Sequence, residues 1–124
     1  MLKFKLTLAI AWLLVFASPV QSASVGDTTT GIAAYYSNVF HGRRTASGER
    51  YDKNAYTAAH KRLPFGTRVR VTNLENGKSV VLKINDRGPR TQNRIIDVSR
   101  RAALDLGFIR KGLTEVQLEV IEVP

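Results

Sequence analysis

The chain contains no cysteine, and this absence constrains its fold more than any other feature of the sequence. It excludes a disulfide framework, a cysteine-ligated zinc site and a thiol nucleophile. Roughly 100 residues remain once the apolar N-terminal segment is set aside, and a domain of that size must be stabilised by its hydrophobic core alone. We therefore expect a small sheet that closes around one centre, because closure hides the edges of the strands.

Residues 1–22 have the pattern of a secretory signal peptide. Lys3 and Lys5 form a positive start, an uncharged and mainly apolar run follows, and small residues come next. The apolar run is shorter than the roughly 20 residues that span a membrane. We place cleavage after Ser22, with Ala23 or Ser24 as near alternatives and an uncleaved anchor as the less favoured interpretation. The expected product is exported and soluble, in the periplasm, cell wall or extracellular space.

The charge of the chain is strongly positive. The net charge is +9, and removal of Lys3 and Lys5 with the signal peptide leaves +7. An excess of this size attracts polyanions. For an exported protein we expect an anionic cell-wall polymer or membrane surface as partner, and no nucleic acid. The basic residues are spread along the chain, which favours weak steering of a partner over a defined basic site.

The first half of the remaining chain has one expected strand and one long loop. Residues 23–31 are polar and predict a flexible lead-in, and residues 32–37 predict a strand. Residues 38–54 have no sustained period and predict an ordered loop, which at this length usually has a function. Residues 55–60 predict a short helical turn, and residues 63–66 an apolar turn.

A β-hairpin is the clearest local prediction. Apolar and polar residues alternate over residues 68–74, and an apolar run follows over residues 79–84. Asn76 and Gly77 lie between them, and Asn-Gly between two such runs is a strong hairpin signal.

The C-terminal third predicts a strand, a helix and a last strand. Residues 94–98 form the first strand, and Ser99 is a good N-cap for a helix over residues 100–106 that Gly107 ends. Residues 114–123 alternate as a strand. Five or six short strands with one clear helix, and no βαβ rhythm, favour a mainly β single domain closed into a barrel.

The predicted hairpin ends in an acidic turn that is a candidate for chemistry. Asp86 and Arg87 lie in a segment, residues 85–89, that closes with Gly-Pro. Taken alone, Asp86 is best explained by an Asx-turn or a pair with Arg87. Glu49 and His60 change this interpretation, since all three titratable groups share one cleft if the long loop folds over the hairpin end. Two carboxylates and an imidazole can then divide acid and base roles.

A metal site is the less favoured use of the same region. No HExxH or other ligand spacing supports zinc. The candidate ligands would be His41, Glu49, His60 and Asp86.

Six motifs resemble, in order, those of the RlpA-like (rare lipoprotein A) family. The match covers residues 31–123 and implies a six-stranded double-psi β-barrel. It also implies the family's activity, endolytic peptidoglycan transglycosylase, with no cofactor. The substrate would be glycan strands lacking stem peptides, cleaved between N-acetylmuramic acid and N-acetylglucosamine. The motifs are GRRTASGE at 42–49, TAAH at 57–60, LPFG at 63–66, VTNL at 71–74, INDRGP at 84–89 and RIIDVS at 94–99.

The resemblance carries the family's essential residues onto Glu49, His60 and Asp86. In lytic cleavage the sugar's own C6 hydroxyl attacks, so one carboxyl group can first donate and then accept a proton. We assign this role to Asp86, with Glu49 as its partner and stabiliser of oxocarbenium charge, although the two acids could be reversed. His60 would orient one of the two carboxyl groups.

Tyr36, Thr45 and Arg87 are candidate contacts to the substrate, although Tyr36 could equally pack in the core. The chain lacks the cysteine that lipidated relatives carry, and we expect no SPOR domain and a monomer. Two alternative functions use the same surface. One is a non-catalytic, expansin-like module that binds cell-wall polysaccharide, and the other is a glycoside hydrolase.

Overall fold

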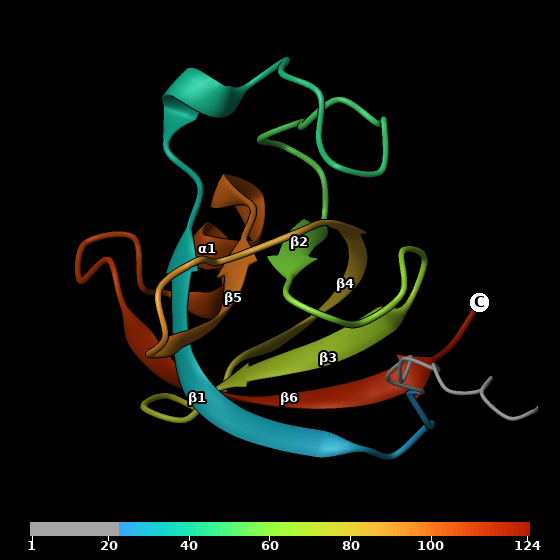
Figure 1. Cartoon of the computed structure of the whole chain (residues 1–124). Coiled ribbons are helices and arrows are strands. Elements are labelled where there is room, and N and C mark those ends of the chain that lie inside the picture. The colour runs from blue at the N-terminus through green and yellow to red at the C-terminus, as the bar shows by residue number, and fades with distance from the viewer. Residues whose placement is uncertain (1–22) are drawn as a thin grey trace, which may run out of the picture.

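The computed structural model describes residues 23–124, and the predicted signal peptide lies outside them. Six strands close into a barrel in the order β1-β5-β2-β4-β3-β6 (Figure 1). One short 3-10 helix and one α-helix accompany them. The elements are β1 (Thr28–Tyr35), η2 (Asn38–Phe40), β2 (Thr57–His60), β3 (Arg68–Asn73), β4 (Ser79–Asp86), β5 (Arg94–Val98), α1 (Arg100–Leu106) and β6 (Thr114–Glu122). The predicted mainly β, six-stranded barrel is confirmed.

The barrel mixes parallel and antiparallel pairs. Strands β1 and β5 are parallel, as are β2 and β4, whereas the other four pairs are antiparallel. Closure gives every strand two partners, so no edge is left unpaired. The parallel pair β2–β4 has a register shift between Ala58 and Ala59, after which Ala59 lies opposite Asp86. This pairing brings the end of β2 beside the candidate acid.

The core follows the alternation of the strands. Val69, Val71 and Asn73 of β3 are buried, as the hairpin pattern predicts. The outward residues between them are Arg70 and Thr72. Val116, Leu118 and Val120 of β6 pack into the same core. Each fully buried aliphatic side chain of this kind contributes about 1.5–3 kcal/mol to folding.

Helix α1 begins and ends as the sequence predicts. The Ser99 hydroxyl accepts a hydrogen bond from the Ala102 amide, which is the geometry of an N-cap. Gly107 ends the helix with φ 78°, where a residue without Cβ is favoured. The cap residue contributes about 1 kcal/mol. The helix buries Ala102, Ala103 and Leu106 against the barrel.

Several sequence predictions of element type or boundary are wrong. The expected lead-in over residues 23–31 is partly strand, because β1 begins at Thr28 and pairs with β6 from its first residue. Residues 57–60 form strand β2 instead of a helical turn. Ala58 pairs with strands on both sides, which overrides the helix propensity of the alanines. Strand β4 runs two residues beyond its predicted end, to Asp86.

The connection from β1 to β2 is the long loop that the sequence predicts. It extends beyond one end of the barrel (Figure 1). Its only regular pieces are η2 and a bridge between Arg44 and Arg50. Within residues 23–124, no helix has the length and apolar character needed to cross a membrane.

Candidate active site

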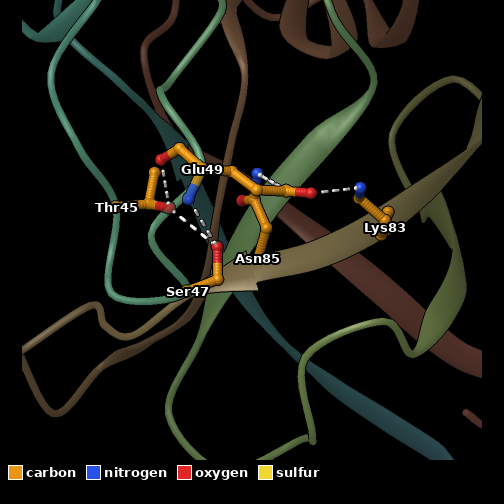
Figure 2. Close-up of polar contacts among 5 residues, drawn as sticks. All are labelled: Thr45, Ser47, Glu49, Lys83 and Asn85. Atoms are coloured by element: carbon orange, nitrogen blue, oxygen red, sulfur yellow. Dashed lines mark hydrogen bonds and ion pairs between the residues drawn. The ribbon is translucent and has the colours of Figure 1, made fainter.

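A tight turn in the long loop places the first acid. The Thr45 amide and hydroxyl both donate to the Glu49 carbonyl oxygen, at 2.8 and 2.7 Å. The Ser47 amide donates to the Asn85 carbonyl at 3.3 Å, which ties the turn to β4. Figure 2 shows Thr45, Ser47, Asn85 and Lys83 around Glu49. Thr45, which the sequence suggests as a substrate contact, is buried and its hydroxyl is committed to the turn.

Glu49 is held by two side chains of strand β4. Lys83 Nζ lies 2.9 Å from Oε2, and Asn85 Nδ2 donates to Oε1 at 3.0 Å (Figure 2). The hydrogen bonds from Lys83 and Asn85 lower the pKa of Glu49. Its side chain is 49% exposed, so solvent screens the ion pair. The result is an accessible carboxylate that remains ionised at neutral pH.

Asp86 receives three donors. Tyr36 Oη donates to Oδ2 at 2.6 Å, while the backbone amides of Ala46 and Arg87 donate to Oδ1 at 2.8 and 2.9 Å. The hydrogen bond from Tyr36 has the length of a charge-assisted O–H···O bond. Because Oδ1 already accepts two N–H groups, a proton on Asp86 must reside on Oδ2. The Tyr36 hydroxyl can then reverse and accept, since a phenol both donates and accepts.

Tyr36 is fixed from behind by a second tyrosine. Its ring stacks on Tyr51 with centroids 4.2 Å apart and planes 12° from parallel, and Tyr51 is buried. Burial and the hydrogen bond to Asp86 raise the pKa of Tyr36, so its hydroxyl keeps its proton. Neither of the two sequence-based alternatives for Tyr36, a contact to the substrate or packing in the core, describes its contacts fully. It packs on an aromatic neighbour, and its polar end contacts the acid.

His60 belongs to a different set of contacts. Its Nδ1 accepts hydrogen bonds from the backbone amides of Arg62 and Leu63, both at 3.0 Å. None of its hydrogen bonds within residues 23–124 reaches Glu49 or Asp86. Burial, with the positive charge of Arg87 next in size, lowers the pKa of His60 to about 4. The contacts that orient Asp86 come from Tyr36 and backbone amides instead.

The Arg87 side chain points to the same turn as His60. Its Nη1 donates to the carbonyl oxygens of Leu63 at 2.8 Å and His60 at 3.3 Å. Its guanidinium lies 4.1 Å from the centre of the Phe65 ring. In this structure Nη1 of Arg87 is therefore used within the protein, by the connection between β2 and β3.

The described residues contain no cluster of three or more histidine, aspartate or glutamate side chains placed as metal ligands. His41, a candidate in the sequence, uses Nδ1 to accept from the Lys53 amide at 3.1 Å. Two pockets lie at other parts of the barrel. His60 and Arg94 line one of them, and Lys111 lines the other. Neither is lined by Glu49 or Asp86. The two carboxylates lie at an accessible surface, which suits a long polymer.

Sequence reasoning missed Lys83, Asn85 and the Ala46 amide. A signal for the first two was present in the alternation of β4. Lys83 and Asn85 are two residues apart, so their side chains leave the same face of the strand. The contact of Ala46 with Asp86 joins residues 40 positions apart and has no local signal.

Known proteins resemble this chain over most of its length. The family model described as lytic transglycolase matches residues 28–118. The endolytic peptidoglycan transglycosylase RlpA of Neisseria meningitidis is 58% identical over 94 residues, covering 76% of this chain and 39% of that protein. The probable endolytic peptidoglycan transglycosylase RlpA of Synechocystis is 54% identical over 101 residues, covering 82% and 32%. The chain spans less than half the length of these relatives.

Two solved structures share the fold. The Streptomyces papain inhibitor has a TM-score of 0.66 and 21% identity, over 82% of this chain and 100% of that one. An expansin from Clavibacter michiganensis has a TM-score of 0.62 and 22% identity, over 79% and 52%. At these identities they show the fold alone, and they support the predicted double-psi β-barrel. With the family model matching most of the chain, the protein belongs to the lytic transglycolase family.

Proposed function

We propose that this chain is an exported lytic transglycosylase that cleaves peptidoglycan glycan strands. The observation that carries the proposal is that one turn contacts both carboxylates. Residues 45–49 present Glu49 to strand β4 and also supply the Ala46 amide to Asp86. The names of the relatives, endolytic peptidoglycan transglycosylases, support the choice of reaction and substrate.

In the proposed reaction Asp86 acts first as acid and then as base. The proton on Oδ2 passes to the glycosidic oxygen as the bond from N-acetylmuramic acid to N-acetylglucosamine breaks. The C6 hydroxyl of the muramic acid then attacks its own anomeric carbon, and Asp86 takes up the hydroxyl proton. The product carries a 1,6-anhydro ring and no water is consumed. An attacker within the same sugar has an effective concentration of about 10⁵ M or more when well oriented.

Glu49 has the complementary task. Its lowered pKa keeps it negative at neutral pH, so it can stabilise the positive charge that develops on the sugar ring. Its exposure leaves room for the substrate to approach. Glu49 would therefore be the charge stabiliser and Asp86 the proton carrier.

The location and partners belong to the same proposal. The pattern of residues 1–22 supports export, which would bring the domain to the periplasm or cell wall as a monomer. The net charge of +7 that remains after cleavage favours an anionic polymer. Strands lacking stem peptides are the proposed preference, and the reaction as written requires no cofactor.

The test is digestion of denuded glycan strands with the purified mature protein, followed by mass spectrometry. We expect fragments with 1,6-anhydro ends, each lighter by one water than a hydrolysis product. Reducing ends in their place would make the protein a hydrolase. Binding to the strands without any fragments would overturn both enzymatic functions and favour an expansin-like binding module.

A further inference from the structure

We infer that His60 acts as a neutral positioning residue, whose Nδ1 organises the turn that anchors Arg87 beside Asp86, and that it neither donates nor accepts the reacting proton. The inference rests on the proposed function for its activity readout, while its structural readout is independent of activity.

The first step is the protonation state of the ring. Nδ1 accepts two backbone N–H groups, from Arg62 and Leu63, so it carries no proton. A neutral imidazole with an unprotonated Nδ1 has its hydrogen on Nε2. Its surroundings maintain this form. Burial opposes a positive charge on the ring most strongly, and the nearby charges of Arg87, Arg62 and Lys61 oppose it further. Arg94 and Asp27 line the same pocket as His60.

The second step links this turn to the acid. The turn that His60 organises presents two carbonyl oxygens, of His60 and Leu63, to the guanidinium of Arg87. Arg87 is thereby anchored at its far end, and its own backbone amide donates to Asp86 Oδ1 at 2.9 Å. A displaced turn would move this amide, and a displacement of about 1 Å can cost about 100-fold in rate.

The third step is that, among residues 23–124, no hydrogen bond joins the ring to either acid. His60 ends β2 and follows Ala59, the residue that pairs with Asp86. Successive side chains of a strand point to opposite faces. His60 accordingly lines a pocket that neither Glu49 nor Asp86 lines.

Two substitutions separate the ring nitrogens. In His60→Asn the amide oxygen sits one bond from Cγ, where Nδ1 was, and can accept the same amides. In His60→Gln the polar group sits one bond farther out, nearer the place of Nε2. We expect His60→Asn to keep activity on denuded glycan within about threefold, and His60→Gln to lose about tenfold or more in kcat with little change in KM. Loss of activity in both variants, or in neither, would overturn the inference, as would loss in His60→Asn alone.

The link through Arg87 has its own test. Arg87→Ala should lower kcat by a similar factor, and the double variant with His60→Gln should lose no more than the larger single loss. Residues that act through one another are non-additive in this way, whereas independent effects multiply. A loss in the double variant equal to the product of the two single losses would show that Arg87 and His60 act independently, and would overturn the inference.

A spectroscopic measurement decides the matter even if a variant fails to fold. The chain has two histidines, so ¹⁵N-histidine labelling of the wild-type protein gives two ring systems, and His41→Gln assigns them. We expect an unprotonated Nδ1 and a protonated Nε2 for His60 at pH 6. A doubly protonated ring, or a proton on Nδ1, would contradict the inference. This result stands whether or not the protein releases anhydro products, so it is distinguishable from failure of the proposed function.

Discussion

The two carboxylates of the site meet at one turn, but they are held in different ways. Asp86 is fixed by two backbone amides and by a tyrosine that is stacked on a buried ring. Glu49 is fixed by two side chains, and half of its surface faces solvent. Backbone amides and a packed ring leave Asp86 little freedom, whereas Lys83 and Asn85 mainly control the charge of Glu49. The difference indicates that geometry matters most for Asp86 and ionisation for Glu49.

The largest expected effect comes from Asp86→Asn. The variant keeps the shape of the side chain but removes the group that carries the proton, and general acid–base catalysis contributes about 10²–10⁴-fold. We expect anhydro products to fall by about 10³-fold in a timed digest. A melting temperature within a few degrees of wild type would show that the loss is chemical. Retained activity would remove Asp86 from the mechanism.

Glu49→Gln should have the next largest effect. The amide occupies the same space but carries no negative charge, so transition-state stabilisation is lost while the turn remains. We expect kcat to fall by about 100-fold, in the range found when one electrostatic stabiliser is removed. Steady-state kinetics on denuded strands measures the change. A loss that appears only in KM would make Glu49 a binding residue instead.

Tyr36→Phe separates packing from hydrogen bonding at Asp86. Phenylalanine preserves the stack on Tyr51 but removes the donor to Oδ2. A hydrogen bond to a charged group contributes about 1.5–3 kcal/mol, which corresponds to a loss of about tenfold or more in kcat. A matched control is Tyr35→Phe, because the Tyr35 hydroxyl donates to the Ile109 carbonyl and not to an acid. Equal activity losses in both variants would mean that Tyr36 acts only through stability.

Lys83→Met should have the smallest effect at neutral pH, about twofold, since a partly exposed ion pair is worth about 0.2–1 kcal/mol. The clearer effect of Lys83→Met is expected in the pH dependence of the rate. Lys83 lowers the pKa of Glu49, so its removal raises that pKa. In the proposed mechanism Glu49 acts as an anion, and in the variant its protonation would set in at a higher pH. We expect the acidic limb of the rate profile to move to higher pH. A downward shift would contradict the assigned interaction.

Local signals predicted the parts of the fold that local interactions determine. Asn76 and Gly77 gave the hairpin, and Ser99 and Gly107 gave both ends of α1. The wrong predictions concern segments whose structure depends on long-range pairing. Residues 57–60 become a strand because β4 and β5 pair with them, and no pattern within four residues encodes that pairing.

The candidate site shows the same difference between what local sequence patterns predict and what long-range contacts determine. Motif resemblance pointed to Glu49, His60 and Asp86, but not to their contacts. The hydrogen bond from Tyr36 to Asp86 joins residues 50 positions apart. The orientation of His60 depends on the turn that follows it in the sequence. Side-chain direction across a closed barrel follows from strand register, which the sequence alone leaves open.

The most direct test of the division between the two acids is the pH dependence of kcat in wild type and Glu49→Gln. If Glu49 must be ionised, wild type has an acidic limb, which lies low because Lys83 and Asn85 lower the pKa of Glu49. The account predicts that Glu49→Gln works at a reduced rate and loses this acidic limb. An acidic limb of unchanged position in Glu49→Gln would show that Glu49 is not the group that must be ionised and would contradict the account.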